Sequence, residues 1–397
     1  MKKKIIALAM TAILAVSLTA CGTTSTTSTP VSEATHPEEN TVTLEPTATP
    51  EPTATPEPTA TPTPAATSEE YFSWKEVNGT IEITRYKGNN KVNDVIIPER
   101  INGYPVTSIG KSAFEDCSSV VSIEIPDGVV NIGNVAFKNC SSLVSIEIPD
   151  GVTCIGDSTF YSCTNLTSIE IPDNVTSIKD YAFYNCTNLT SIEIPGSVTS
   201  IGWHAFDTCT SLSKIEMAEG VTSIGGHAFV RCESLTSINM PNSITSIGKW
   251  AFLDCINLTS VHLPEGLPVI EEYTFGHCSK LTNINIPNSV ISIGDVAFVG
   301  CNISSIAIPN SVTSIGTSAF RETALTNVTI PYSVTYIDSY AFSYCNKLTT
   351  IIIPSSVMGM GEDIVRGSSN LKKIVVSKNS YAEKWAKNNG YGSKIQN

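Results

Sequence analysis

Hydrophobic and polar positions follow one pattern along most of this chain, and the pattern returns at a fixed interval. From Val106 to about Val376 the order Leu-x-x-Ile-x-Ile-Pro, Val-x-x-Ile-Gly, Ala-Phe, Cys occurs twelve times, with some substitutions. Successive copies are 22 or 23 residues apart. A fixed period of about 20–29 residues is typical of solenoids, in which each copy is one turn and neighbouring turns bury each other's apolar residues. The sequence therefore predicts twelve rungs of 22–23 residues.

Each rung contains two short extended runs. In one rung, alternation predicts a strand whose Leu143, Ile146 and Ile148 point inward while Glu147 points outward. The proline that follows ends this strand. Val152–Gly156 is a second short extended run, expected on the opposite wall. Parallel stacking of such rungs predicts a β-rich leucine-rich-repeat solenoid, in which every repeat position becomes a column along its length.

The segments that flank the rungs have the composition of caps. Residues 71–105 include an alternating run, Thr80–Tyr86, which predicts a strand, and Asn89-Asn90, which suits a turn. We expect this segment to cover the first rung. In residues 377–397, Ser380–Asn389 predicts a short helix that ends at glycine and covers the last rung. The solenoid proper is therefore expected over residues 106–376.

The first 70 residues predict export and attachment. Residues 1–20 combine three lysines with the short apolar run Ile5–Ser17, as in secretory signal peptides. Leu18-Thr-Ala-Cys21 resembles the lipobox of bacterial lipoproteins, which implies that Cys21 carries a lipid anchor; the alternative is an ordinary signal peptide with an incidental cysteine. Residues 21–70 contain Glu-Pro-Thr-Ala-Thr-Pro three times in Glu45–Pro62 and predict a disordered tether.

Composition and motifs narrow the function. The formal net charge is −13, so the basic footprint of a nucleic-acid-binding protein is absent. The sequence contains no glycine-rich phosphate loop, no His-Glu-x-x-His and no Gly-x-Ser-x-Gly. We therefore expect neither an enzyme nor a cofactor.

A column of cysteines runs through the rungs. Outside the cytoplasm cysteines often form disulfides, and neighbouring rungs would bring their Cα atoms about 4.8 Å apart, which a disulfide permits. A uniform ladder, however, offers no reason for one pairing over another, and cysteine is also a good small core residue. Buried free thiols are favoured over bridges, and no zinc spacing is present. The column comprises Cys117, Cys140, Cys163, Cys186, Cys209, Cys232, Cys255, Cys278, Cys301 and Cys345.

The outward position of the main strand, here called the outward slot, is occupied by glutamate in five successive rungs. These are Glu124, Glu147, Glu170, Glu193 and Glu216. Later rungs carry polar residues in this slot and the last carry apolar ones. Two interpretations remain open: duplication of one rung that copied its exposed residues, or a binding surface for a basic partner or divalent cations.

A third column precedes the Ala-Phe pair and is aromatic or imidazole over five rungs. It consists of Tyr181, His204, His227, Trp250 and Tyr273. Exposed rings in a row can bind glycans or peptide side chains, whereas rings packed over the phenylalanines would only complete the core. No metal site is expected, because the two histidines have no third ligand in the pattern.

The full rung, Cys-x-x-Leu-x-x-Ile-x-Ile-Pro-x-x-Val-x-x-Ile-Gly-x-x-Ala-Phe-x-x-Cys, resembles the BspA-type leucine-rich repeats of bacterial surface proteins from Asp94 to Val376. The resemblance implies a surface or secreted protein, in a family some of whose members are implicated in adhesion, but it carries no fixed binding residues. This chain departs from the pattern at Thr323, where cysteine is usual. Two rungs, ending at Pro309 and Pro331, are one residue short, and we expect them to disturb the local curvature.

Together these features predict a lipid-anchored protein at the bacterial cell surface whose solenoid binds an extracellular protein or glycan, as adhesins do. A carbohydrate-binding or substrate-capture module is the first alternative. A structural component of the envelope is the second. Strand-face glutamates favour a protein ligand, whereas the ring column favours a glycan.

Overall fold

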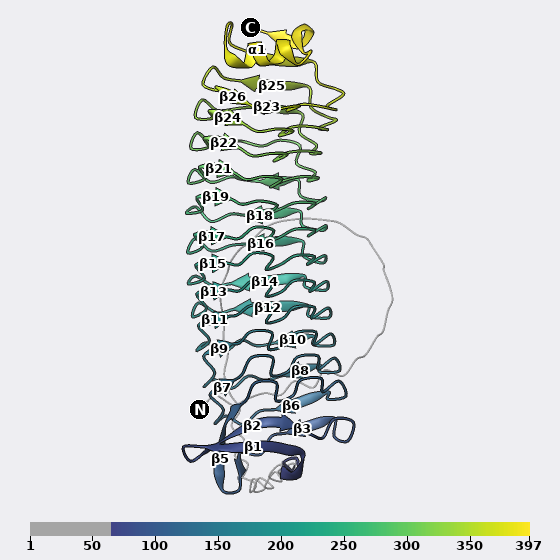
Figure 1. The fold of residues 1–397 in the computed structure, drawn as a ribbon, viewed down its shortest axis with the longest axis vertical. Helices are drawn as coiled ribbons and strands as arrows, with labels where there is room; N and C mark the ends of the chain where they lie inside the picture. Colours follow the sequence, from purple (N-terminus) through teal and green to yellow (C-terminus); the bar gives the residue numbers. More distant parts are fainter. Residues whose placement is uncertain (1–64) are drawn as a thin grey trace, which may run out of the picture. The chain divides into compact units, whose positions relative to one another are not determined.

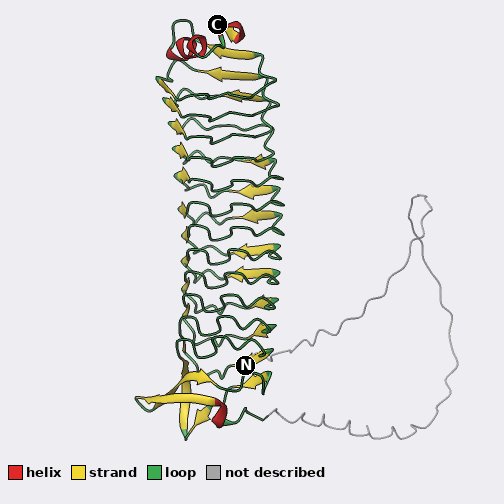
Figure 2. Ribbon diagram, turned by 45° about the vertical axis from the view of Figure 1, so that its right-hand side comes forward, coloured by secondary structure: helices red, strands yellow, loops and turns green. Residues whose placement is uncertain are grey.

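The computed structural model describes residues 65–397, which form a stack of rungs between two caps. The predicted solenoid is confirmed. Two columns of short strands run along its length, one for each extended run of the rung, with the C-terminal helix at one end (Figures 1 and 2). The predictions for Cys21 and for most of the tether lie outside the described residues. No helix in the described part of the chain is long and apolar enough to cross a membrane.

The first column of strands forms what we call the strand face, meaning the side on which the outward slot lies. Within each of its sheets neighbouring strands pair in parallel and in the repeat register, so that Ile123 lies beside Ile146 and Ile146 beside Ile169. Its strands are β6 (Ser122–Glu124), β8 (Ser145–Ile146), β10 (Ser168–Ile169), β12 (Ser191–Ile194), β14 (Lys214–Met217), β16 (Ser237–Asn239), β18 (Ser260–His262), β20 (Asn283–Ile284), β23 (Asn327–Thr329), β25 (Thr350–Ile353) and β27 (Lys373–Val376).

The second column is more regular, with two residues in each strand. Its pairing is parallel, as in Ser177 beside Ser200, and it continues unbroken from β19 to β26. Its strands are β7 (Asn131–Ile132), β9 (Cys154–Ile155), β11 (Ser177–Ile178), β13 (Ser200–Ile201), β15 (Ser223–Ile224), β17 (Ser246–Ile247), β19 (Val269–Ile270), β21 (Ser292–Ile293), β22 (Ser314–Ile315), β24 (Tyr336–Ile337) and β26 (Gly359–Met360).

A column of phenylalanine rings lies at the centre of the core. Every ring is fully buried, and from Phe137 onward successive rings are within 11° of parallel with centroids 5.1–5.8 Å apart. Offset rings at this distance attract each other beyond the effect of burial alone. The column comprises Phe114, Phe137, Phe160, Phe183, Phe206, Phe229, Phe252, Phe275, Phe298, Phe320 and Phe342.

The cysteines of the column are buried free thiols, which is the interpretation that the sequence favoured. From Cys140 onward each thiol donates a hydrogen bond to the carbonyl of the phenylalanine one rung earlier, as Cys186 does to Phe160 at 3.1 Å. At the cysteine position of the last rung, the hydroxyl of Ser368 makes the same bond to Phe342 at 2.9 Å. The thiol is the second donor to this carbonyl, which also accepts a backbone N–H within its own turn, as Phe160 does from Cys163 at 3.1 Å.

Thiol reactivity gives a direct check of this core. Burial raises the pKa of Cys117 to about 11 and that of Cys163 to about 12, so almost no thiolate is present at pH 8. In a Cys21→Ser background we expect Ellman's reagent to modify the half-buried Cys154 before unfolding and the ten column thiols only after denaturant is added. Adding Cys154→Ser should remove the early phase. Rapid modification of several thiols in the native protein would contradict the buried column.

The N-terminal cap continues the stack rather than merely covering it. A short turn of helix, η1 (Glu69–Tyr71), leads into an antiparallel hairpin whose second strand matches the predicted run. That strand lies parallel to β5, which in turn pairs with β7 of the second column. A strand that includes Val95 also joins the strand face, beside β6. The elements are β1 (Phe72–Val77), β2 (Thr80–Tyr86), β3 (Asp94–Ile96), β4 (Arg100–Ile101) and β5 (Tyr104–Ile109).

The C-terminal cap is a helix followed by one more strand. Helix α1 (Tyr381–Asn388) begins after Ser380, whose hydroxyl accepts the backbone N–H of Glu383 at 3.1 Å, and it ends before a glycine with positive φ, as expected. Trp385 lies over the last rung and donates to the carbonyl of Gly361 at 3.0 Å. After η2 (Gly392–Lys394), strand β28 (Ile395–Gln396) pairs with β27.

The first short rung disturbs the stack on one side only. The sheet of the strand face is interrupted between β10 and β12, between β14 and β16, and between β20 and β23. Only at the last of these is a whole strand missing, because residues 301–309 contain none. On the second wall β21 and β22 still pair directly. The missing residue lies in the turn before Ile303, immediately upstream of the strand-face run. The second short rung, which ends at Pro331, keeps its strand β23, so a missing residue does not by itself remove the strand, and the effect on curvature stays a prediction.

Candidate binding surfaces

The glutamates of the outward slot form one exposed line on the strand face. Register places Glu193 directly beside Glu216 on the parallel pair β12 and β14, and all five carboxylates are exposed. Lys214, the one lysine among the strands that carry the line, pairs with Glu216 at 2.7 Å. Like charges about 5 Å apart in water repel by roughly 1 kcal/mol, less in salt. This repulsion costs the fold some stability, and Glu124, Glu170 and Glu193 are exposed where a positively charged ligand can reach them.

The predicted ring column is also brought together, as a continuous stack. Ring centroids are 4.8 Å apart from Tyr181 to His204, 4.4 Å from His204 to His227, 5.5 Å from His227 to Trp250 and 4.0 Å from Trp250 to Tyr273. All five side chains are half-buried. The rings therefore stabilise one another and still present an edge to solvent.

Every residue of this column lies in the left-handed region of the backbone, with φ between 51° and 65° from Tyr181 to Tyr273. Non-glycine residues seldom adopt it, and for large side chains it costs free energy. Hydrogen bonds to the next rung hold the turn, as from the N–H of Phe206 to the carbonyl of Ala228 at 2.8 Å. Stacking between neighbouring rungs offsets part of this cost.

A buried carboxylate, which the sequence did not single out, supports the column. Asp207 is buried and accepts from Thr208 at 2.8 Å, and one of its oxygens lies 2.6 Å from Nδ1 of His204. Beside it, Trp203 is 47% exposed and meets the ring of His227 edge-on at 5.5 Å. Within residues 65–397, no three His, Cys, Asp or Glu side chains come close enough to hold a metal ion.

The imidazole stack predicts a pH dependence of stability. Burial, and then the neighbouring His204, lower the pKa of His227, whereas Asp207 opposes this shift. The unfolded chain therefore takes up a proton at this position at a higher pH than the folded chain does, and unfolding becomes easier as the pH falls below about 6.5. Between pH 7.5 and 5 we expect the melting temperature of the wild type to fall more than that of His227→Phe. Trp250→Phe, in the same column, should follow the wild type.

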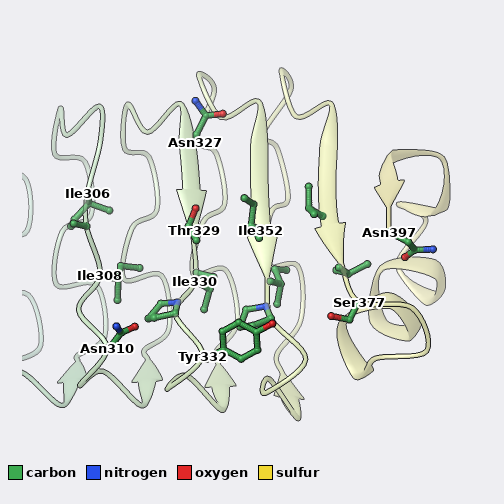
Figure 3. Close-up of a pocket in the computed structure, with 16 residues that line it drawn as sticks. Ile306, Ile308, Asn310, Asn327, Thr329, Ile330, Tyr332, Ile352, Ser377 and Asn397 are labelled. Carbon is green, nitrogen blue, oxygen red and sulfur yellow. The ribbon is translucent and has the colours of Figure 1, made fainter.

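A third surface, which the sequence did not identify as a site, lies on the C-terminal part of the strand face. It is a hollow of about 750 Å³, which we call the C-terminal hollow. In Figure 3, Thr329 and Ile352 lie along its floor, Asn327 lies at one rim and Tyr332 at the other. Ile352 is 39% exposed and Tyr332 is 72% exposed. Such exposure of large apolar side chains is unusual where no partner covers them.

The charge of the strand face reverses where this hollow lies. From Cys278 to Asn379 the strand-face parts of the rungs, from the cysteine position to the second residue after proline, contain no acidic residue. They contain five exposed lysines: Lys280, Lys347, Lys372, Lys373 and Lys378. The sequence signal was present in the outward slot, which becomes Ala307, Thr329, Ile352 and Val375, all lining residues. The face is therefore acidic at one end and basic with apolar side chains at the other.

The repeats of this chain match a known family of proteins. A family profile described as "BspA type Leucine rich repeat region (6 copies)" matches residues 79–213, 176–290 and 268–387. The chain thus belongs to the BspA-type leucine-rich-repeat family. No curated protein matches it.

Two solved structures are similar along nearly their whole length. A leucine-rich repeat protein from Bacteroides ovatus is 28% identical with a TM-score of 0.60, over 82% of this chain and 98% of that one. A leucine rich cell surface protein from Faecalibacterium prausnitzii is 30% identical with a TM-score of 0.54, over 82% of this chain and 97% of that one. Both support the same repeat fold.

Proposed function

We propose that this chain is displayed outside the cell as an adhesin-like binding protein and that its strand face holds a protein ligand. The family supports a protein-interaction repeat, and one similar protein is described as a cell surface protein. The observation that carries the proposal is the exposed line of carboxylates on successive strands. Because these glutamates repel one another and add little to the core, a complementary basic ligand accounts for them better than folding does.

Attachment to the membrane through Cys21 is part of this proposal. The basic start, the short apolar run and the small residues before Cys21 support export and lipidation. We expect labelled palmitate to be incorporated when the chain is expressed in a bacterium and Cys21→Ser to release the protein into the medium. Incorporation that persists in Cys21→Ser would contradict this anchor.

Binding to an array of extracellular matrix proteins and glycans tests the ligand class. The full chain should bind a protein on the array, and Glu170→Gln/Glu193→Gln should weaken that binding and its sensitivity to salt. Glu233→Gln/Glu265→Gln removes two charges from later strand-face runs but not from the outward slot, and should bind as the wild type does. Equal loss in both variants would point to net charge rather than to this line. If the chain binds no protein or glycan on the array, a structural role in the envelope is favoured.

A carbohydrate ligand is the second candidate, favoured by the ring stack beside the exposed Trp203. Planar rings bind the apolar faces of sugars through the same stacking contacts that they make with each other. A glycan hit that survives Glu170→Gln/Glu193→Gln but disappears in Trp203→Ala would assign the site to this column. Loss in Trp203→Ala without unfolding would distinguish contact from stability.

A further inference from the structure

We propose that the C-terminal hollow binds an extended segment of another protein in which apolar side chains stand among carboxylates. This rests on the proposed function, a surface protein that binds a protein ligand, and it assigns a place and a chemistry to one contact. The hollow lies along β23, β25 and β27 and is lined by outward residues such as Thr329 and Ile352 together with the edges of core residues such as Ile330.

The size and lining of the hollow suit apolar anchors. A volume of about 750 Å³ falls in the range of pockets that take small ligands or several side chains. Ile306, Ile352 and Val375 supply apolar walls, and Tyr332 offers a ring at the rim. Aromatic and aliphatic side chains that enter such hollows provide most of the energy at protein interfaces.

A second hollow extends the first toward the middle of the solenoid. It measures about 600 Å³, lies beside β18 and β20, and shares Ile306 and Ala307 with the C-terminal hollow. From β18 to β27 there are five steps between rungs, or about 24 Å at about 4.8 Å each. An extended chain of about seven residues covers that length at about 3.3 Å per residue. A peptide lying along the solenoid axis therefore fits both hollows.

Polar groups along the hollows favour a peptide over a lipid chain. Amide side chains of Asn285, Asn310, Asn327 and Asn397 line them, and each can donate to or accept from a peptide group. Among the described residues, the backbone N–H groups of residues 304–308 also have no hydrogen-bond partner. An acyl chain would leave all of these groups unused.

The lysines set the charge of the segment. Lys373 lies on the same outward side of β27 as Val375, and Lys378 directly follows Ser377 at the end of the hollow. Both are exposed, and no acidic residue occurs in the strand-face runs around them. A segment with aspartate or glutamate next to its apolar anchors matches this rim, whereas a basic segment is repelled.

Selection from a displayed library of random twelve-residue peptides tests this proposal with the full chain as target. Enriched peptides should combine aromatic or aliphatic residues with Asp or Glu. A labelled peptide from the selection should bind Ile352→Glu at least about tenfold more weakly and Lys373→Glu/Lys378→Glu several-fold more weakly. Val144→Glu introduces the same charge at a similarly exposed apolar position, 41% against 39%, in the acidic half. It should bind within twofold of the wild type.

Several results would overturn the proposal. Enriched peptides that are basic or polar would do so, as would equal binding to Ile352→Glu and Val144→Glu. Tyr332→Ser alters the most exposed residue of the hollow and provides a second variant if Ile352→Glu fails to fold. Binding to phosphatidylglycerol vesicles that depends on Ile352, without peptide enrichment, would assign the hollow to lipid. Concentration-dependent self-association lost in Ile352→Glu would assign it to a second copy.

The two proposals fail separately. The array experiment depends on the glutamates of the outward slot, at the other end of the strand face, and its variants leave the hollow unchanged. Loss of peptide binding only in the hollow variants would support the hollow even if the array remained silent. If the chain binds a protein on the array and Ile352→Glu leaves that binding unchanged, the result supports a surface binding protein. It also shows that the hollow takes no part in that binding.

Discussion

Phe229→Ala is expected to lower the free energy of unfolding by about 3–5 kcal/mol. Phe229 is fully buried in the middle of the ring column, with Phe206 at 5.3 Å on one side and Phe252 at 5.2 Å on the other. Truncation removes two stacked pairs and leaves a void that parallel rungs, fixed by their hydrogen bonds, cannot close. Urea unfolding followed by circular dichroism measures the loss.

The position of the defect also predicts the shape of the transition. In a solenoid each rung contacts only its neighbours, so stability is close to a sum of rung and interface terms. A weakened central interface should let the two halves unfold separately, with a broader transition than the wild type. Tyr181→Ala, which truncates a half-buried ring of the neighbouring column, should cost less. Equal losses in the two variants would contradict a core centred on the phenylalanines.

The repeat predicted the fold because its spacing determines both the strands and the contacts between them. Residues such as Ile146 and Phe137 had one possible role, since a 23-residue shift places each beside its own copy. The cysteine column was predicted by the same reasoning. The hydrogen bond from each thiol to a carbonyl one rung earlier was not predictable from the pattern. That bond depends on the turn geometry, which the sequence leaves open.

The candidate surfaces were predictable to different degrees. Exposure of the glutamate line follows from strand alternation, and its alignment follows from the register. The left-handed backbone at Tyr181 and His204 was not expected, because bulky residues are rare there. It belongs to the turn of every rung, since Val135 and Val296 adopt it at the same position without stacked rings. The role of Asp207 was not predictable from the sequence, because aspartate is common in turns and the burial of this residue arises from packing between rungs.

The C-terminal hollow was missed for a different reason. The apolar slot residues and the absence of acidic residues were visible, but a slot of small and apolar residues on a regular strand is an ordinary flat surface. The strand is also lost in the rung at residues 301–309, which is shifted by one missing residue; the rung ending at Pro331 lacks a residue at the same place and keeps β23. Such a shift changes the relation between whole rungs and has no counterpart in any single column.

Hydrogen exchange should show this break directly. The amide of Ile306 has no hydrogen-bond partner among the described residues, whereas that of Ile330, one rung later, donates to the carbonyl of Ile352 at 2.9 Å. We expect the amide of Ile306 to exchange at least about 100-fold faster than that of Ile330, since opening the paired strand requires local unfolding. Similar protection at the two positions would contradict the break in the sheet.

Restoring the missing residue should repair the strand and close the hollow. Insertion of one serine between Cys301 and Asn302 gives this rung the length of the regular rungs before it, so residues 305–307 can pair with β20 in the repeat register. The amide of Ile306 should then gain protection and peptide binding at the hollow should weaken. The same insertion between Cys278 and Ser279 lengthens a regular rung and should instead reduce protection in β20. If both insertions had the same effect, rung length would not be the cause of the hollow.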